Sequence, residues 1–152
     1  MDKSEALQTL QCAREVGVVY DVKKTSIQLL NKVVHHFESV GKNVMTLGFI
    51  AEKKLDDHTP TIKEEYFCLN DLTFWKLPKK AVVSNFISKK FDFLINLDLL
   101  GSNELQAIST YSNAKIRIGK HFEEYPFSQD FMIKSHAESG DELFNEIKKY
   151  IK

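Results

Sequence analysis

The chain has 152 residues, 43% of them hydrophobic and 28% charged, which fits one globular domain over residues 1–152 with an ample core. Its 21 basic and 21 acidic residues give a formal net charge of zero, which argues against a general binder of nucleic acid or acidic polymers. We see no bilayer-spanning apolar run, no signal peptide and only 2 cysteines, so we expect a cytoplasmic protein without membrane insertion and with reduced thiols.

Strands and helices are predicted to alternate along the chain. Strands are expected where apolar residues run together, and helices where apolar residues recur every three or four positions. The expected strands lie at 16–20, 43–50, 65–69, 93–97, 114–119 and 131–133. The expected helices lie at 3–14, from a cap at Thr25 or Ser26 to Ser39, at 83–88, from a cap at Ser102 or Asn103 to Tyr111, and from a cap at Ser139 or Asp141 to Tyr150. The first of these forms an N-terminal extension over residues 1–15.

The segment 91–120 is the most informative part of the chain. Its first strand, 93–97, is nearly all apolar, as expected for a strand covered by helices on both faces. Its second strand, 114–119, alternates apolar and basic residues, which indicates a position nearer the edge of the sheet. A strand, a helix and a second strand in this order are typical of a βαβ unit. Repeated along the chain, the pattern predicts a three-layer α/β sandwich with a mostly parallel, doubly wound, Rossmann- or flavodoxin-like sheet of about five to six strands.

Four polar residues are candidates for a ligand site. Ligands of such sheets bind outside the carboxyl ends of the strands, at the point where the strand order reverses. The predicted strands deliver Asp21, Asp98, Lys120 and His136 to that edge. Together they can bind a small polar ligand. The alternative is that they are ordinary polar ends of buried strands.

Two groups of aromatic residues are candidates for an interaction patch. Trp75 follows the third predicted strand, and Phe122, Tyr125 and Phe127 follow the fifth. Exposed aromatic groups of this kind can mediate self-association or partner binding. The alternatives are that Trp75 is anchored in the core and that the aromatic loop is a lid over it.

A lysine-rich stretch from Lys76 to Lys90 contains no acidic residue and has aromatic residues beside it. This combination is compatible with single-stranded nucleic acid or a phosphorylated ligand. The balanced charge of the whole chain favours a solvated loop instead, so we do not expect nucleic-acid binding.

Several sharper motifs are absent from the sequence. It contains no GxGxxG, GxxxxGK[ST] or GxSxG motif, and its histidines have no spacing typical of metal ligands. A single Asp21 follows the first strand where a receiver domain would have an acidic pair. We therefore predict no cofactor, no metal and no catalytic residue.

Several segments carry a resemblance to known families. They read VGVVYD, MTLGFI, FDFLINL, SNAKIRIG and NEIKKYI. With them the chain resembles a bacterial family of short, uncharacterised α/β proteins, a domain of unknown function. That family has no assigned chemistry, so the resemblance implies no catalytic residues. FDFLINLDLL and AKIRIGK are also similar to a local segment of the N-terminal Rossmann-like domain of lipopolysaccharide heptosyltransferases, which need a second such domain.

These observations favour an α/β domain that acts by binding a protein partner or by self-association. The alternative is a binder of a small nucleotide- or sugar-phosphate-like ligand, or a transferase-like enzyme, that uses the carboxyl edge of the sheet. Nucleic-acid binding through the lysine-rich stretch is a third hypothesis.

Overall fold

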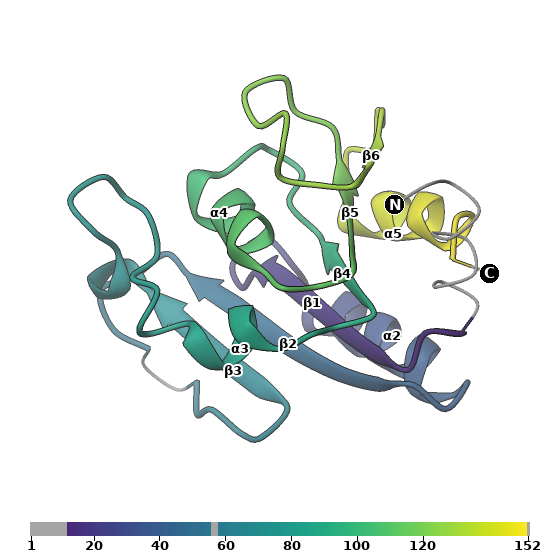
Figure 1. Cartoon of the computed structure of the whole chain (residues 1–152), viewed down its shortest axis with the longest axis horizontal. Helices are drawn as coiled ribbons and strands as arrows, with labels where there is room; N and C mark the ends of the chain where they lie inside the picture. Colours follow the sequence, from purple (N-terminus) through teal and green to yellow (C-terminus); the bar gives the residue numbers. More distant parts are fainter. Residues whose placement is uncertain (1–11, 56–57, 152) are drawn as a thin grey trace.

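A computed structural model of the chain describes residues 12–55 and 58–151, and a parallel β-sheet lies at its centre (Figure 1). Its strands are β1 (Glu15–Asp21), β2 (Asn43–Ile50), β3 (Glu64–Cys68), β4 (Phe93–Asn96), β5 (Ile116–Lys120) and β6 (Phe131–Ile133). The helices are α2 (Ile27–Glu38), the 3-10 turn η1 (Leu69–Asp71), α3 (Ser84–Ser88), α4 (Asn103–Tyr111) and α5 (Gly140–Lys148). The helix predicted at 3–14 falls almost entirely on residues 1–11, outside the described residues.

The six strands pair in the order β3-β2-β1-β4-β5-β6, and every neighbouring pair is parallel. This is the order of a doubly wound sheet. The predicted α/β sandwich with a parallel sheet is therefore confirmed. The chain first extends the sheet on one side of β1 and then crosses to the other side at β4. The point where strand order reverses thus lies between β1 and β4.

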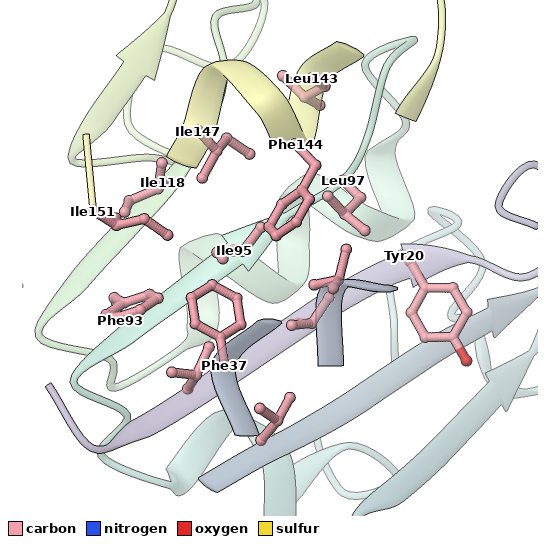
Figure 2. Packing of buried hydrophobic residues seen from close by; sticks show 14 of the residues in the cluster. Tyr20, Phe37, Phe93, Ile95, Leu97, Ile118, Leu143, Phe144, Ile147 and Ile151 are labelled. Carbon is pink, nitrogen blue, oxygen red and sulfur yellow. The ribbon is translucent and has the colours of Figure 1, made fainter. Parts of the chain in front are cut away.

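Helices α2 and α5 cover one face of the sheet. Figure 2 shows Phe37 of α2 and Phe144 of α5 packed together over the strands. The ring centroids of Phe37 and Phe144 are 6.1 Å apart, and those of Phe37 and Phe93 are 5.5 Å apart, both in edge-to-face arrangements. This geometry adds to the stabilisation gained by burying the rings. Leu97 continues the cluster beyond the end of β4.

Helices α3 and α4 cover the opposite face, in front of the sheet in Figure 1. Phe86 and Leu105 from these helices pack with Phe91, which precedes β4. A Cβ atom at Gly17 would lie 2.8 Å from Cδ2 of Phe91, so only glycine at this position of β1 lets the ring lie against the strand. Gly48 of β2 lies against the side chain of Tyr20, since a Cβ atom at this position would lie 2.8 Å from the Tyr20 hydroxyl.

The predicted caps place helix N-termini at the carboxyl edge of the sheet. Ser26, Ser102 and Ser139 are the N-caps of α2, α4 and α5, and each side chain accepts a hydrogen bond from a backbone N–H of its helix. Each helix follows a strand, so all three begin where strands end. Within the described residues, no helix is long and apolar enough to cross a lipid bilayer.

Candidate functional site

A cavity of about 540 Å³ lies at the carboxyl ends of β1 and β4, where the strand order reverses. Its volume falls within the roughly 300–1,000 Å³ range of small-molecule sites. The lining combines five charged side chains with leucines and small residues. It consists of Asp21, Lys24, Thr25, Leu97, Asp98, Leu99, Leu100, Ser102, Leu105, Lys120, Ala137, Glu138 and Gly140.

The cavity brings together three of the four residues that the sequence predicts as a ligand site. Asp21, Asp98 and Lys120 all line it, although they come from the ends of three different strands. His136 does not line it, and its side chain is exposed. The next residue, Ala137, faces the cavity instead. An offset of one position in the segment after β6 thus decides which side chain reaches the site.

The Asp98 carboxylate is occupied by its own loop. Oδ1 accepts hydrogen bonds from the backbone N–H groups of Leu100 (3.0 Å) and Gly101 (3.1 Å). Oδ2 accepts from the backbone N–H of Ser102 (2.7 Å) and from the side-chain amide of Gln106 (2.9 Å). With these four partners and only 4% of its surface exposed, Asp98 shapes the loop between β4 and α4. We therefore assign it a positioning role.

Asp21 keeps one carboxylate oxygen outside such contacts. Its Oδ1 accepts hydrogen bonds from the backbone N–H groups of Lys23 (2.9 Å) and Lys24 (3.3 Å), in the turn that follows β1. Neither bond uses Oδ2, and no basic side chain of the described residues forms a salt bridge with Asp21. The residue is 8% exposed. A buried carboxylate with an oxygen left over is a strong acceptor for a ligand's donor.

Lys120 supplies a half-buried ammonium group. Its Nζ donates a hydrogen bond to the backbone oxygen of Leu99 at 3.2 Å and lies 5.7 Å from the ring centroid of Phe122. Within the described part of the chain, no carboxylate forms a salt bridge with it. An ammonium group has three N–H donors, so Lys120 can bind an acceptor in the cavity while it keeps its bond to Leu99.

A buried polar network supports the loop from behind. Asn96 donates to Ser109 Oγ at 2.9 Å, and Gln129 donates to the same oxygen at 3.1 Å. Gln129 also donates to Gln106 Oε1 at 3.3 Å, which extends the network to the partner of Asp98. Sequence reasoning missed Gln106, Ser109 and Gln129. For Gln106 and Ser109, the only signal in the sequence is a polar residue at a helix position that faces the sheet.

Trp75, predicted as part of an interaction patch, is exposed. The alternative, that Trp75 is anchored in the core, is therefore wrong. Trp75 is 76% exposed and Phe74 is 90% exposed, with their rings edge to face at 5.3 Å. The turn that carries them is closed by hydrogen bonds from Thr73 N–H to the oxygen of Leu77 (2.7 Å) and from Lys76 N–H to the oxygen of Thr73. Lys76 has φ 59°, a left-handed conformation that non-glycine residues rarely adopt.

The second aromatic group is only partly exposed. Phe127 is 83% exposed, whereas Phe122 is half-buried against Gly101, whose Cβ would lie 3.0 Å from the Phe122 ring. The hydroxyl of Tyr125 donates a hydrogen bond to Asn103 Oδ1. Burial, together with the charge of nearby carboxylates, raises the pKa of Tyr125. Two of the three residues thus support the start of α4.

The two aromatic groups do not form one patch. Trp75 follows β3 and the 122–127 loop follows β5, on opposite sides of the sheet centre. Figure 1 shows the two loops as separate projections.

Parts of the lysine-rich stretch make contacts within the chain. Lys80 lies 4.6 Å from the ring centroid of Tyr111, and Lys89 forms a 3.7 Å salt bridge with Glu15.

The fold and the cavity together define a doubly wound α/β protein with a candidate ligand site at its switch point. Among residues 12–55 and 58–151, no three His, Cys, Asp or Glu side chains group in a way that could hold a metal ion. The chain belongs to a family of unknown function (DUF6913), whose family model matches residues 2–152. This confirms the expected membership of a family without assigned chemistry. No curated protein and no solved structure matches the chain.

Proposed function

We propose that this protein binds a small molecule in the cavity between β1 and β4. One observation carries the proposal. Asp21 and Lys120, on different strands, line a single cavity whose other walls include leucine side chains. Apolar walls with a few convergent polar groups are typical of small-molecule sites. The position outside the carboxyl ends of the strands at the switch point is where this class of fold binds its ligands.

The loops around the cavity argue against a nucleotide or sugar phosphate. In doubly wound folds, free backbone N–H groups of such loops bind phosphate oxygens. Here Asp21 accepts two of these N–H groups after β1, and Asp98 accepts three after β4. A phosphate would have to displace a buried carboxylate. The transferase-like reaction, the bacterial origin and the similarity to heptosyltransferases remain predictions. The lining of the cavity contains no residue that supports any of them.

A ligand screen with a blocked variant tests the proposal. Thr25 lines the cavity and is half-buried, so Thr25→Trp should fill part of it. The control is Thr110→Trp, at an exposed position of α4 outside the lining. A ligand at a hundred times its Kd stabilises the folded state by about 2.7 kcal/mol. We expect some small molecule to raise the melting temperature of the wild type and of Thr110→Trp but not of Thr25→Trp. Binding that survives in Thr25→Trp contradicts the proposal.

Partner binding or self-association is the second candidate function. The observation that favours it is the pair Phe74 and Trp75, held on a closed turn with most of both side chains in solvent. Exposed aromatic groups that the fold does not use are typical of interaction sites. Sedimentation velocity over a range of concentrations, with wild type and Trp75→Ser, tests self-association. We also propose a cytoplasmic location for the protein, which the two free thiols of Cys12 and Cys68 support.

A further inference from the structure

The charge of the cavity narrows the class of ligand, if the cavity binds one as proposed above. We infer that the cavity takes a small zwitterion with an apolar side chain, of the α-amino acid type. The acidic side chains of the lining are Asp21, Asp98 and Glu138, and the basic ones are Lys24 and Lys120. The lining therefore has a formal charge of −1. Such a site repels a polyanion such as a nucleotide and suits a ligand whose own charges balance.

Asp21 and Lys120 present opposite charges that do not satisfy each other. Both line the cavity, and among the described residues neither forms a salt bridge with the other or with another side chain. Burial of an unpaired charge is costly, so a ligand that supplies both counter-charges gains at both ends. A zwitterion does this with one molecule. Its ammonium group can donate to Asp21 Oδ2, and its carboxylate can accept from Lys120 Nζ.

The other two acidic groups are poor alternatives for the ammonium group. The oxygens of Asp98 already accept four hydrogen bonds from the loop and from Gln106. Glu138 is exposed, so its charge is solvated and screened. Lys24 is exposed as well, which leaves Lys120 as the half-buried cation of the lining.

The apolar walls account for the rest of the ligand. Leu97 and Leu105 are buried beside Asp98, and Leu99 and Leu100 belong to the loop that this aspartate shapes. Burial of an aliphatic or aromatic side chain against them is favourable in proportion to the apolar area removed from water. The volume of about 540 Å³ leaves room for a branched or aromatic side chain.

Ligands that differ by one charged group test the inference. The probes are leucine, 4-methylpentanoate, which lacks the ammonium group, and 3-methylbutylamine, which lacks the carboxylate; phenylalanine, AMP and inorganic phosphate complete the set. Titration calorimetry on the wild type should give binding of leucine or phenylalanine at least about tenfold tighter than binding of either single-charge analogue, because each loses a charge-assisted hydrogen bond.

Matched variants assign each end of the ligand. Asp21→Asn keeps Oδ1 for the turn and should abolish the preference for leucine over 4-methylpentanoate, while Lys120→Met should abolish the preference over 3-methylbutylamine. The controls are Asp92→Asn and Lys115→Met, which remove the same charges just before β4 and β5, at the opposite end of the sheet. Both should keep the wild-type pattern. If AMP, phosphate or a single-charge analogue binds more tightly than leucine and phenylalanine, the inference of a zwitterionic ligand is wrong, although the cavity remains a ligand site. If the broad ligand screen described above finds no small molecule whose binding is blocked by Thr25→Trp, the proposed function is wrong as well.

Discussion

The side-chain amide of Gln106 donates a hydrogen bond to Oδ2 of Asp98, at 2.9 Å, in the buried space between α4 and the loop that precedes it. Gln106 also accepts a hydrogen bond from Gln129 through its Oε1. The loop that lines the cavity is thereby connected to the segment before β6. One wall of the candidate site is fixed by polar contacts beneath it, independently of any ligand.

The first prediction concerns Asp98→Asn. The amide nitrogen of asparagine cannot accept hydrogen bonds, so either the Ser102 N–H and Gln106 amide or the N–H groups bound by Oδ1 lose their acceptor. We expect the free energy of unfolding to fall by about 2–3 kcal/mol. Urea denaturation measures it. The control is Glu123→Gln, at an exposed position, which should change stability by less than about 0.5 kcal/mol. Equal effects of the two substitutions would contradict the positioning role of Asp98.

Much of the architecture could be predicted from sequence because its signals are local. Apolar runs define the strands, and Ser26, Ser102 and Ser139 mark helix starts because a short hydroxyl side chain can accept a backbone N–H. The association of Asp21 with Lys120 follows from topology, since parallel strands bring their carboxyl ends to one edge.

The rest depends on contacts that local patterns do not encode. Asp98 is occupied because the backbone of its own loop folds around the carboxylate, and residue type alone does not show this. His136 faces solvent because the segment after β6 is irregular and has no period that fixes side-chain direction. Trp75 is exposed because the antiparallel bridge between Leu72 and Pro78 closes a short turn that projects it outward.

A second prediction tests the close packing of Gly17 against Phe91. In Gly17→Ala the new methyl group would lie 2.8 Å from the buried Phe91 ring, closer than real Cβ contacts allow. We expect a loss of about 1–3 kcal/mol in the free energy of unfolding. Phe91→Leu removes the ring, so the double variant should be more stable than the sum of the two single effects predicts. Strict additivity in urea denaturation would show that the ring is not the obstacle.

A third prediction follows from the hydrogen bonds of Asp92. Its Oδ2 accepts from the backbone N–H groups of Arg14 (2.8 Å) and Glu15 (2.9 Å), and its Oδ1 lies 3.2 Å from Lys115 Nζ. Burial alone would raise the pKa of Asp92, but these contacts outweigh it and the pKa is lowered from the ordinary value of 3.8. The stability that the ionised group contributes is thus fully present above that value and is lost as the pH falls through the folded-state pKa.

Asp92→Asn should therefore reduce the free energy of unfolding by about 1–3 kcal/mol at neutral pH. The difference between wild type and variant should shrink as the pH is lowered below 3.8, because the wild type then loses the charge too. Urea denaturation of both proteins across the acid range measures this difference. A difference that stays constant through the acid range would show that the charge of Asp92 does not matter.

The fourth prediction uses the only tryptophan of the chain. Trp75 is 76% exposed, so we expect a fluorescence emission maximum close to that of free tryptophan and efficient quenching by acrylamide. Phe74→Ser with Trp75→Ser should leave the free energy of unfolding within about 0.5 kcal/mol of wild type, because exposed side chains contribute little to it. The contrasting control is Phe86→Ser, at a fully buried position of α3, which should destabilise the fold strongly. Emission typical of a buried indole at low protein concentration would contradict the exposed turn. A shift to such emission only as the concentration rises would show that Trp75 becomes covered by a second copy of the chain.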